Sequence, residues 1–211
     1  MFDLDGTLID TMGGFADVAA EVMAELHGID AVTGRRRYLE TSGIPFRQQL
    51  EVIAPGHAQN ARASDIFEVK KRAYADHADL DSQTLRALER LRSLGMKLVV
   101  SSNSAQYFVD EFAARQAFRF DLVLGFDAEA GLAKGRPHVE RTCKELGALT
   151  PEILFCGDSI KDGELAHECG LRFIARLGTF SRDDFHRWNP EVTAVADIHA
   201  LAELVASRAA A

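Results

Sequence analysis

Two aspartates stand close together near the start of the chain, in an otherwise apolar stretch. Asp3 and Asp5 lie in the opening segment Met1–Asp10, which predicts the end of a strand that passes into a turn at Gly6. On an extended chain, residues i and i+2 point to the same side. One carboxylate can then attack a phosphorus atom and form an aspartyl-phosphate, while the other handles the proton of the leaving group. The pair is a candidate for covalent phosphoryl transfer.

Further polar residues follow two later apolar runs of the chain. Ser101, Ser102 and Asn103 stand at the end of the apolar run that begins at Lys97. Asp158 and Asp162 follow the run 153–156, and Lys134 lies in the sequence between these two groups. In a parallel sheet, ligands bind at the carboxyl ends of the strands, so these groups should converge. Clustered carboxylates repel unless a cation lies between them, and Mg²⁺ accepts such oxygen ligands readily. Hydroxyl and ammonium groups suit a phosphate. We expect one site that holds both Mg²⁺ and a phosphate.

Each of these residues also has a purely structural interpretation. Asp158 and Asp162 can serve as N-caps of the helix that follows them. Either serine can cap the next helix; Ser101 is the preferred phosphate ligand because it directly ends the apolar run, and a shift by one residue to Ser102 stays open. Lys134 can be an ordinary surface lysine, and Arg136 is a rival cation nearer to the following proline.

The elements that must position these residues alternate between short apolar runs and helices. The runs are 97–101, 121–124, 153–156 and 171–175, and the expected helices are 84–93, 105–116, 138–146 and 160–169. Short apolar strands alternating with helices are typical of βαβ units and of a parallel sheet with both faces covered. The fold class is therefore α/β, with a doubly wound, Rossmann-like core.

A helical module interrupts this core after the first strand. Apolar residues recur at helical spacing from Phe15 to Leu26, a further helix is expected from Ala63 to His77, and no strand alternation occurs between them. We expect a core made of residues 1–11 and 81–211, with an all-helical domain at 12–80. The Ala-rich end, Ala206–Ala211, is expected to be the end of a last helix.

Composition narrows the classes of function. The 211 residues carry a net charge of −8, which disfavours a nucleic-acid backbone as the main partner. No apolar run approaches the roughly 18–20 residues that a membrane span needs. Three scattered cysteines, at 143, 156 and 169, suggest neither a disulfide framework nor a zinc site. We find no leader-like segment and expect a cytoplasmic protein. Its expected partner is a small phosphorylated metabolite. The sequence does not specify its oligomeric state.

These motifs together resemble those of the haloacid dehalogenase-like superfamily of phosphatases. The correspondence runs in the family's order through Phe2–Leu8 (FDLDGTL), Leu98–Ser101 (LVVS), Lys134 with Pro137, and Gly157–Asp162 (GDSIKD). One departure is that Gly135 stands where many members have the first proline of the third motif. The helical module between the first two motifs resembles the first type of cap domain in that family.

The resemblance implies a role for each motif residue. Asp3 is the expected nucleophile and Asp5 the expected acid and base. Mg²⁺ is expected to bind Asp3, the backbone carbonyl of Asp5, and Asp158. Asp162 is expected to act through a metal-bound water or by contacting the residues that bind the metal. The phosphoryl oxygens are expected on Lys134 and Ser101, with Ser102 and Asn103 beside them. Asp5 also favours phosphoryl chemistry over dehalogenation, because the dehalogenases lack this second aspartate.

In the helical module, the segment 41–47 is the expected substrate loop. Gly43 would lie in that loop and Arg47 would bind an anionic part of the substrate, although Arg47 is equally interpretable as a solvated helix residue. The leading hypothesis is a Mg²⁺-dependent phosphomonoester hydrolase. A sugar phosphomutase of the same superfamily and a non-catalytic metabolite-binding member remain alternatives.

The first strand is unusually short. Met1 lies two residues before Asp3, a reach of only about 7 Å, whereas the central strand of the family normally begins several residues earlier. Either the start of the sequence is trimmed or misassigned, which we favour, or the first strand is shortened and leaves part of the neighbouring sheet surface uncovered.

Overall fold

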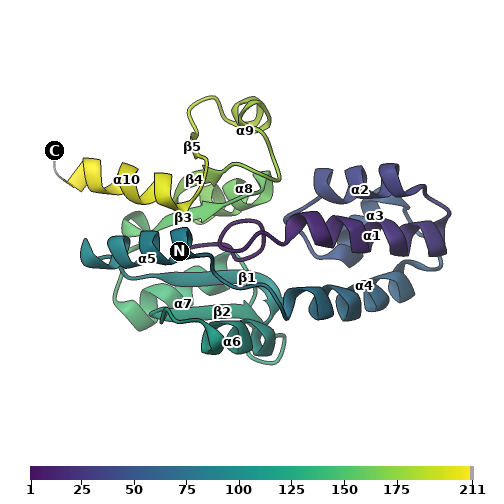
Figure 1. Cartoon of the computed structure of the whole chain (residues 1–211), viewed down its shortest axis with the longest axis horizontal. Coiled ribbons are helices and arrows are strands. Elements are labelled where there is room, and N and C mark those ends of the chain that lie inside the picture. The colour runs from purple at the N-terminus through teal and green to yellow at the C-terminus, as the bar shows by residue number, and fades with distance from the viewer. Residues whose placement is uncertain (210–211) are drawn as a thin grey trace. The chain divides into compact units, whose positions relative to one another are not determined.

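A computed structural model describes residues 1–209 of the chain (Figure 1). The chain divides into two compact units. One contains Met1–Ile9 and the residues from Asp79 onward, and the other is Asp10–Ala78. The expected divisions, after residue 11 and before residue 81, lie two residues further along the chain than these.

A parallel β-sheet forms the centre of the first unit. Its strands are β1 (Val99–Ala105), β2 (Leu122–Phe126), β3 (Leu154–Gly157), β4 (Arg172–Arg176) and β5 (Thr193–Val195). β1 pairs with β2, and β3 pairs with β4 and β4 with β5, all in parallel. Phe2 forms parallel bridges to both Val100 and Cys156, so the first residues of the chain join the two groups of strands. The α/β fold class is confirmed.

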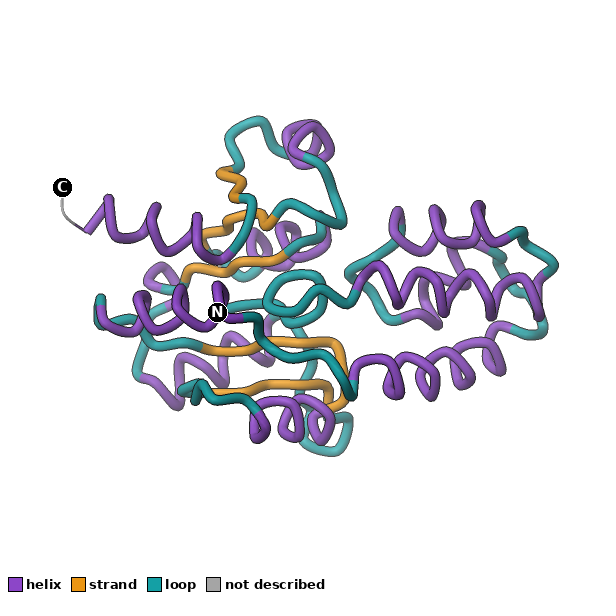
Figure 2. Tube along the Cα trace, viewed as in Figure 1, coloured by secondary structure: helices purple, strands orange, loops and turns teal. Residues whose placement is uncertain are grey.

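Helices cover both faces of this sheet (Figure 2). They are α5 (Ser82–Ser93), α6 (Gln106–Arg115), α7 (Arg136–Leu146), α8 (Ile160–Glu168), α9 (Arg182–Trp188) and α10 (Ile198–Ala209), with a short 3₁₀ turn at Thr150–Glu152. Phe155 packs with Val139 of α7 and Ala166 of α8. The next residue, Cys156, points to the other face, where it lines a small cavity with Leu91 of α5 and Leu201 of α10. Successive side chains of β3 therefore pack into two separate hydrophobic layers, one on each face of the sheet.

The second unit is entirely helical across residues 10–78. Its helices are α1 (Met12–His27), α2 (Ala31–Glu40), α3 (Phe46–Ile53) and α4 (Asn60–Ala75). The rings of Phe46 and Phe67 pack at a tilt of 36° with their centroids 4.1 Å apart, and Tyr38 packs against both. This aromatic cluster gives the unit a hydrophobic core of its own.

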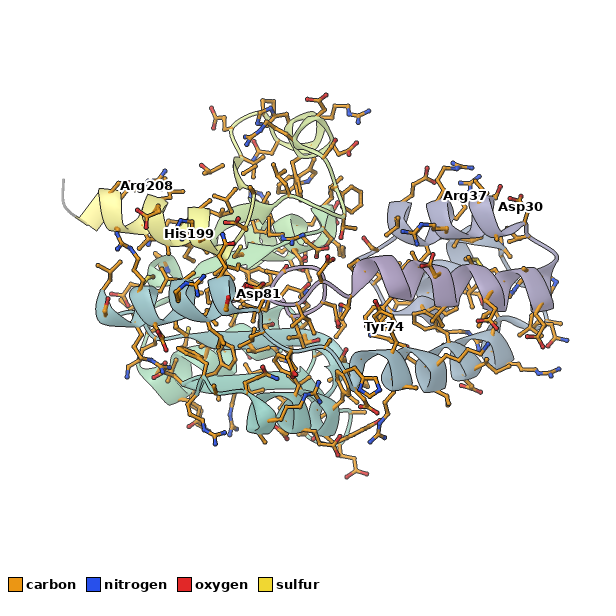
Figure 3. All side chains as sticks on the ribbon, in the orientation of Figure 1. Asp30, Arg37, Tyr74, Asp81, His199 and Arg208 are labelled. Carbon is orange, nitrogen blue, oxygen red and sulfur yellow. The ribbon has the colours of Figure 1, made fainter. Side chains whose placement is uncertain are left out.

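Several helices begin and end at residues that satisfy their free backbone groups. Asp30 caps α2 and Asp81 caps α5 by accepting hydrogen bonds from backbone N–H groups (both are labelled in Figure 3). α1 ends at Gly28, whose φ of 66° is the left-handed conformation expected of a helix-ending glycine.

The end of the chain differs from expectation in extent. The alternation of apolar runs and helices predicted from the sequence ends with the run 171–175. The structure has α9, β5 and most of α10 beyond that run. Of the expected helix end at Ala206–Ala211, residues 210 and 211 lie outside the described residues. Among residues 1–209, no helix combines the length and the apolar character that crossing a bilayer requires.

Candidate active site

A buried cluster of three carboxylates and one ammonium lies at the carboxyl ends of the central strands. Asp3, Asp158 and Asp162 each offer an oxygen, and these oxygens lie within 4.8 Å of one another. The Nζ of Lys134 lies 2.7 Å from Oδ1 of Asp3 and 2.5 Å from Oδ1 of Asp162. All four side chains are almost completely excluded from solvent. The structure therefore brings together residues that are far apart in sequence.

The sheet and one helix terminus fix the three carboxylates. The N–H of Asp3 donates to the carbonyl of Cys156 at 2.9 Å, which aligns the first segment with β3. Ser159 caps α8, and Oδ2 of Asp162 accepts hydrogen bonds from both the N–H and the hydroxyl of Ser159. Asp162 thus completes the cap with one oxygen and contacts Lys134 with the other. Gly157 has no room for a side chain, because a Cβ there would lie 2.6 Å from Cβ of Asp162.

Burial makes the ionised forms of these carboxylates costly. It raises the pKa of Asp3 to about 7; Lys134 opposes this rise, and the charge of Asp162 adds to it. Burial also raises the pKa of Asp158 well above its usual value, and Asp3 and Asp162 raise it further. Burial lowers the pKa of Lys134, but its two carboxylate partners outweigh this and leave it raised. One ammonium among three carboxylates leaves an unbalanced acidic site, suited to a further cation.

Thr179 belongs to the same site and is not suggested by the sequence pattern. Its hydroxyl donates to Oδ2 of Asp158. It lies in the loop after β4, 21 residues beyond Asp158. The only available signal was the rule that residues after each parallel strand face the same edge of the sheet.

The two candidate serines at the end of β1 have different environments. The hydroxyl of Ser101 lies 2.9 Å from Nδ1 of His138, whose Nε2 lies 3.0 Å from the carbonyl oxygen of Gly125. That carbonyl only accepts, so Nε2 carries the ring proton and Nδ1 accepts the proton of Ser101. Burial lowers the pKa of His138 to about 4, which keeps the ring neutral. The Ser101 hydroxyl therefore donates its hydrogen bond to Nδ1 of a buried, neutral histidine.

Ser102, the next residue, projects from the opposite side of the extended chain. Its Oγ accepts a hydrogen bond from the N–H of Ser104 at 3.0 Å, and Asn103 between them is exposed. The Oγ of Ser104 donates to Oδ2 of Asp5 at 3.1 Å. This arrangement favours Ser102 over Ser101 as the hydroxyl available to a ligand, and it connects the end of β1 to the second aspartate.

A profile of the haloacid dehalogenase-like hydrolase family matches residues 1–176, which include every residue of the carboxylate cluster. The chain belongs to the haloacid dehalogenase-like hydrolases. Within that family it is a phosphatase, as its curated relatives are.

The similar curated proteins include phosphoglycolate phosphatases. The one from Chromobacterium violaceum is 27% identical over 183 residues, covering 82% of each chain. The one from Pseudomonas syringae pv. syringae is 26% identical over 185 residues, covering 83% of this chain and 67% of the relative.

Solved structures of other hydrolases share the fold, one of them named a haloacid dehalogenase-like family protein. A member from Streptococcus pneumoniae superposes with a TM-score of 0.77 at 22% identity, covering 96% of each chain. A hydrolase from Pseudomonas syringae has a TM-score of 0.78 at 17% identity, covering 98% of this chain and 96% of the other.

Within this haloacid dehalogenase-like site, Lys134 rather than Arg136 is the cation of the cluster. The guanidinium of Arg136 lies 3.4 Å from the backbone carbonyl oxygen of Glu168, and its side chain is exposed. Gly135, with a positive φ of 108°, separates the two residues and is the N-cap of α7, which begins at Arg136. A proline cannot adopt a positive φ, so the departure from the family's third motif has a conformational counterpart here.

The helical unit of the hydrolase holds the two expected substrate residues. Gly43 has a φ of 95° in the turn between α2 and α3. Arg47 is half-exposed on α3, where its Nε lies 3.8 Å from Oε1 of Glu51 one helical turn away. Their role in binding substrate stays a prediction.

Proposed function

We propose that the protein is a Mg²⁺-dependent phosphomonoesterase that hydrolyses a small phosphorylated metabolite through an aspartyl-phosphate on Asp3. The observation that carries the proposal is the contact of Lys134 with both Asp3 and Asp162, beside Asp158, at one buried edge of the sheet. A structural ion pair needs one carboxylate per ammonium. Three buried carboxylates around one lysine are instead the arrangement expected of a site that binds a cation and an anion together.

The two aspartates of the first motif divide the chemistry between them. An oxygen of Asp3 attacks phosphorus, and the bond from phosphorus to the leaving oxygen breaks. The leaving oxygen keeps the electron pair and takes the proton of the Asp5 carboxyl group. Water then attacks phosphorus, gives a proton back to Asp5, and releases the Asp3 carboxylate and inorganic phosphate. Each cycle returns both carboxyl groups to their starting state.

The donor set fits a magnesium ion. Asp3 and Asp158 offer buried carboxylate oxygens whose pKa values are raised, so an additional positive charge would stabilise their ionised forms. The backbone carbonyl of Asp5 would complete the protein ligands, with Asp162 reached directly or through water. When bound, Mg²⁺ would offset negative charge on the phosphoryl oxygens.

The remaining polar groups would bind the phosphoryl oxygens. Lys134 would offset their charge and, before substrate binds, neutralises part of the charge on Asp3. Ser102 and Asn103 would donate hydrogen bonds from the end of β1. Ser101, through its hydrogen bond to His138, would stabilise the conformation at the end of β1 and would not contact the substrate itself.

The curated relatives favour a small phosphorylated acid as substrate. Several of them are named phosphoglycolate phosphatase, and they cover most of this chain. In our proposal the helical unit, residues 10–78, acts as a cap that excludes water and selects the leaving group. Gly43 and Arg47 would contact the part of the substrate that is not the phosphate.

A phosphate-release screen tests this function. Purified protein with Mg²⁺ is offered phosphoglycolate, sugar phosphates and other phosphorylated metabolites, and inorganic phosphate is measured. Release that a chelator stops and added Mg²⁺ restores supports the proposal. Interconversion of a phosphosugar without phosphate release would indicate a mutase, and binding without turnover of any phosphomonoester would indicate a non-catalytic protein.

A further inference from the structure

The end of β1 contains a bulge that reaches the second aspartate of the site. Ser101 pairs with Leu124 and Ala105 pairs with Phe126, so four steps along β1 correspond to two steps along β2. The intervening residues, 102–104, are displaced from the regular ladder. Ser104 is only 7% exposed, and its Oγ donates to Oδ2 of Asp5 at 3.1 Å.

The surroundings hold this bulge in one conformation. The N–H of Ser104 donates to Oγ of Ser102 at 3.0 Å. Beneath it, a Cβ on Gly125 would lie 2.8 Å from the carbonyl oxygen of Ser104 and 2.7 Å from Cα of Gln106, so only glycine fits there. The N–H of Gly125 in turn donates to the side-chain oxygen of Gln106 at 2.6 Å. These contacts fix the backbone at Ser104, and the backbone in turn fixes the position of the Ser104 hydroxyl.

We infer that Ser104 is a positioning residue that orients the Asp5 carboxyl group for proton transfer to the leaving group. The inference rests on the proposed role of Asp5 as acid and base. A hydroxyl that donates to Oδ2 fixes the rotation of the carboxyl group and leaves Oδ2 as the acceptor. The transferable proton is then carried on Oδ1. The same hydrogen bond persists when Asp5 is ionised, because a carboxylate oxygen also accepts from a hydroxyl.

This role predicts a dependence on the leaving group that a structural role would not produce. An alkyl phosphate leaves as a strongly basic alkoxide and needs the proton from Asp5 as the bond breaks. The nitrophenolate of p-nitrophenyl phosphate is a far weaker base and needs that proton much less. The ratio kcat/KM includes steps only through the first irreversible one, which is transfer of the phosphoryl group to Asp3. Slow hydrolysis of the aspartyl-phosphate therefore does not mask the difference.

The experiment compares Ser104→Ala with the wild-type enzyme on 2-phosphoglycolate and on p-nitrophenyl phosphate, at one pH and one Mg²⁺ concentration. We expect kcat/KM to fall about tenfold further for the alkyl substrate than for the aryl one, a part of the roughly 10²–10⁴-fold that general acid catalysis supplies. Ser104→Thr keeps the hydroxyl and should restore most of the loss. Asp5→Asn should show a difference of the same sign and larger size.

Asn103→Ala is the matched control, since it removes a neighbouring exposed amide assigned to the phosphoryl group common to both substrates and keeps the hydrogen bond from the N–H of Ser104 to Ser102. It should lower kcat/KM equally for the two. Equal losses for both substrates in Ser104→Ala, or a loss that Ser104→Thr does not recover, would overturn the role of Ser104 while leaving the proposed function intact. Absence of turnover of both substrates by the wild-type enzyme would overturn both.

Discussion

The two units of the molecule use the same charged residue types in opposite ways. In the core, Lys134 contacts Asp3 and Asp162, and its side chain is 3% exposed. In the helical unit, Lys70 lies 2.6 Å from Glu21, but the two side chains are 35% and 63% exposed. Water solvates the second pair whether or not it forms, so the pair contributes little to stability. Water does not solvate the buried cluster, so keeping its groups charged lowers the free energy of unfolding.

This contrast indicates where selection for chemistry outweighs selection for stability. Arg35, for example, pairs with Asp17 at the surface and also donates to the carbonyl of Gly13, which is ordinary helix-to-helix bonding. The core cluster instead concentrates carboxylates whose pKa values are raised first by burial and further by their mutual repulsion. Substitutions in the two units should therefore differ in both size and kind of effect.

The largest effect is expected for Asp3→Asn. The amide cannot attack phosphorus, so turnover should fall by about 10⁴-fold or more. The fold should survive, because the substitution keeps the shape of the side chain and removes one of three mutually repelling charges. Phosphate release measures the first effect, and the circular dichroism melting temperature measures the second. Activity near the wild-type level would contradict the nucleophile assignment.

Lys134→Met sharpens the contrast through stability. It leaves Asp3 and Asp162 buried without their cation, and we expect a loss of about 3–5 kcal/mol in the free energy of unfolding. Lys70→Met is the matched control in the helical unit, with an expected loss of about 1 kcal/mol or less. Urea unfolding in the presence of a chelator measures both. Equal losses in the two variants would contradict the distinction between the units.

His138 extends the comparison to a buried residue that is neutral. Its pKa is about 4 in the folded protein, below its ordinary value of 6.5, because burial disfavours the charged ring. The unfolded chain therefore binds a proton at a higher pH than the folded chain. The stabilising contribution is complete above pH 6.5 and is lost as the pH falls toward 4, by about 3 kcal/mol in total.

The measurement is the free energy of unfolding at several pH values for the wild-type protein and for His138→Gln. The wild-type protein should lose about 3 kcal/mol more than the variant between neutral pH and pH 4. Exposed His199 provides the control, and His199→Gln should retain the wild-type pH dependence. A parallel dependence in the wild type and His138→Gln would show that His138 titrates normally.

Metal binding should stabilise the core and leave the helical unit unaffected. At a Mg²⁺ concentration about 100 times the dissociation constant, binding should add about 2.7 kcal/mol to the stability of the folded protein. Asp158→Asn should weaken this increase, whereas Glu21→Gln should not change it. Melting temperatures measured against Mg²⁺ concentration provide the comparison. A wild-type melting temperature that is independent of Mg²⁺ would contradict the metal site.

Much of the fold and the central cluster could be predicted because local patterns carry the information. The apolar runs that became β1 to β4 alternate with helices, and polar groups stand at the ends of the runs that became β1 and β3. Asp3, Asp158 and Lys134 could be associated because parallel strands present their carboxyl ends at one edge. The N-cap interpretation of Asp158 and Asp162 is wrong, because Ser159 is the N-cap of α8. Asp162 stands at the third position of that helix, where one carboxylate oxygen accepts from Ser159 and the other contacts Lys134.

The parts that sequence reasoning missed depend on long-range contacts. Our proposed choice of Ser102 over Ser101 as a phosphate ligand rests on the hydrogen bond between Ser101 and His138, two residues that lie 37 positions apart in sequence. The bulge depends on Gly125, whose missing side chain leaves room for the Ser104 carbonyl oxygen. Thr179 reaches Asp158 from a loop that carries no periodic pattern. In each case a tertiary contact selects the conformation, and the local sequence permits several.

The most direct test of the account is to trap the covalent intermediate. The enzyme is mixed with excess substrate and Mg²⁺, quenched in acid within the first turnover, digested and analysed by mass spectrometry. The account predicts a phosphoryl group on the peptide that begins at Met1, attached to Asp3, and none in the same experiment with Asp3→Asn. A phosphoryl group on another residue, or phosphate release by Asp3→Asn at the wild-type rate, would contradict it.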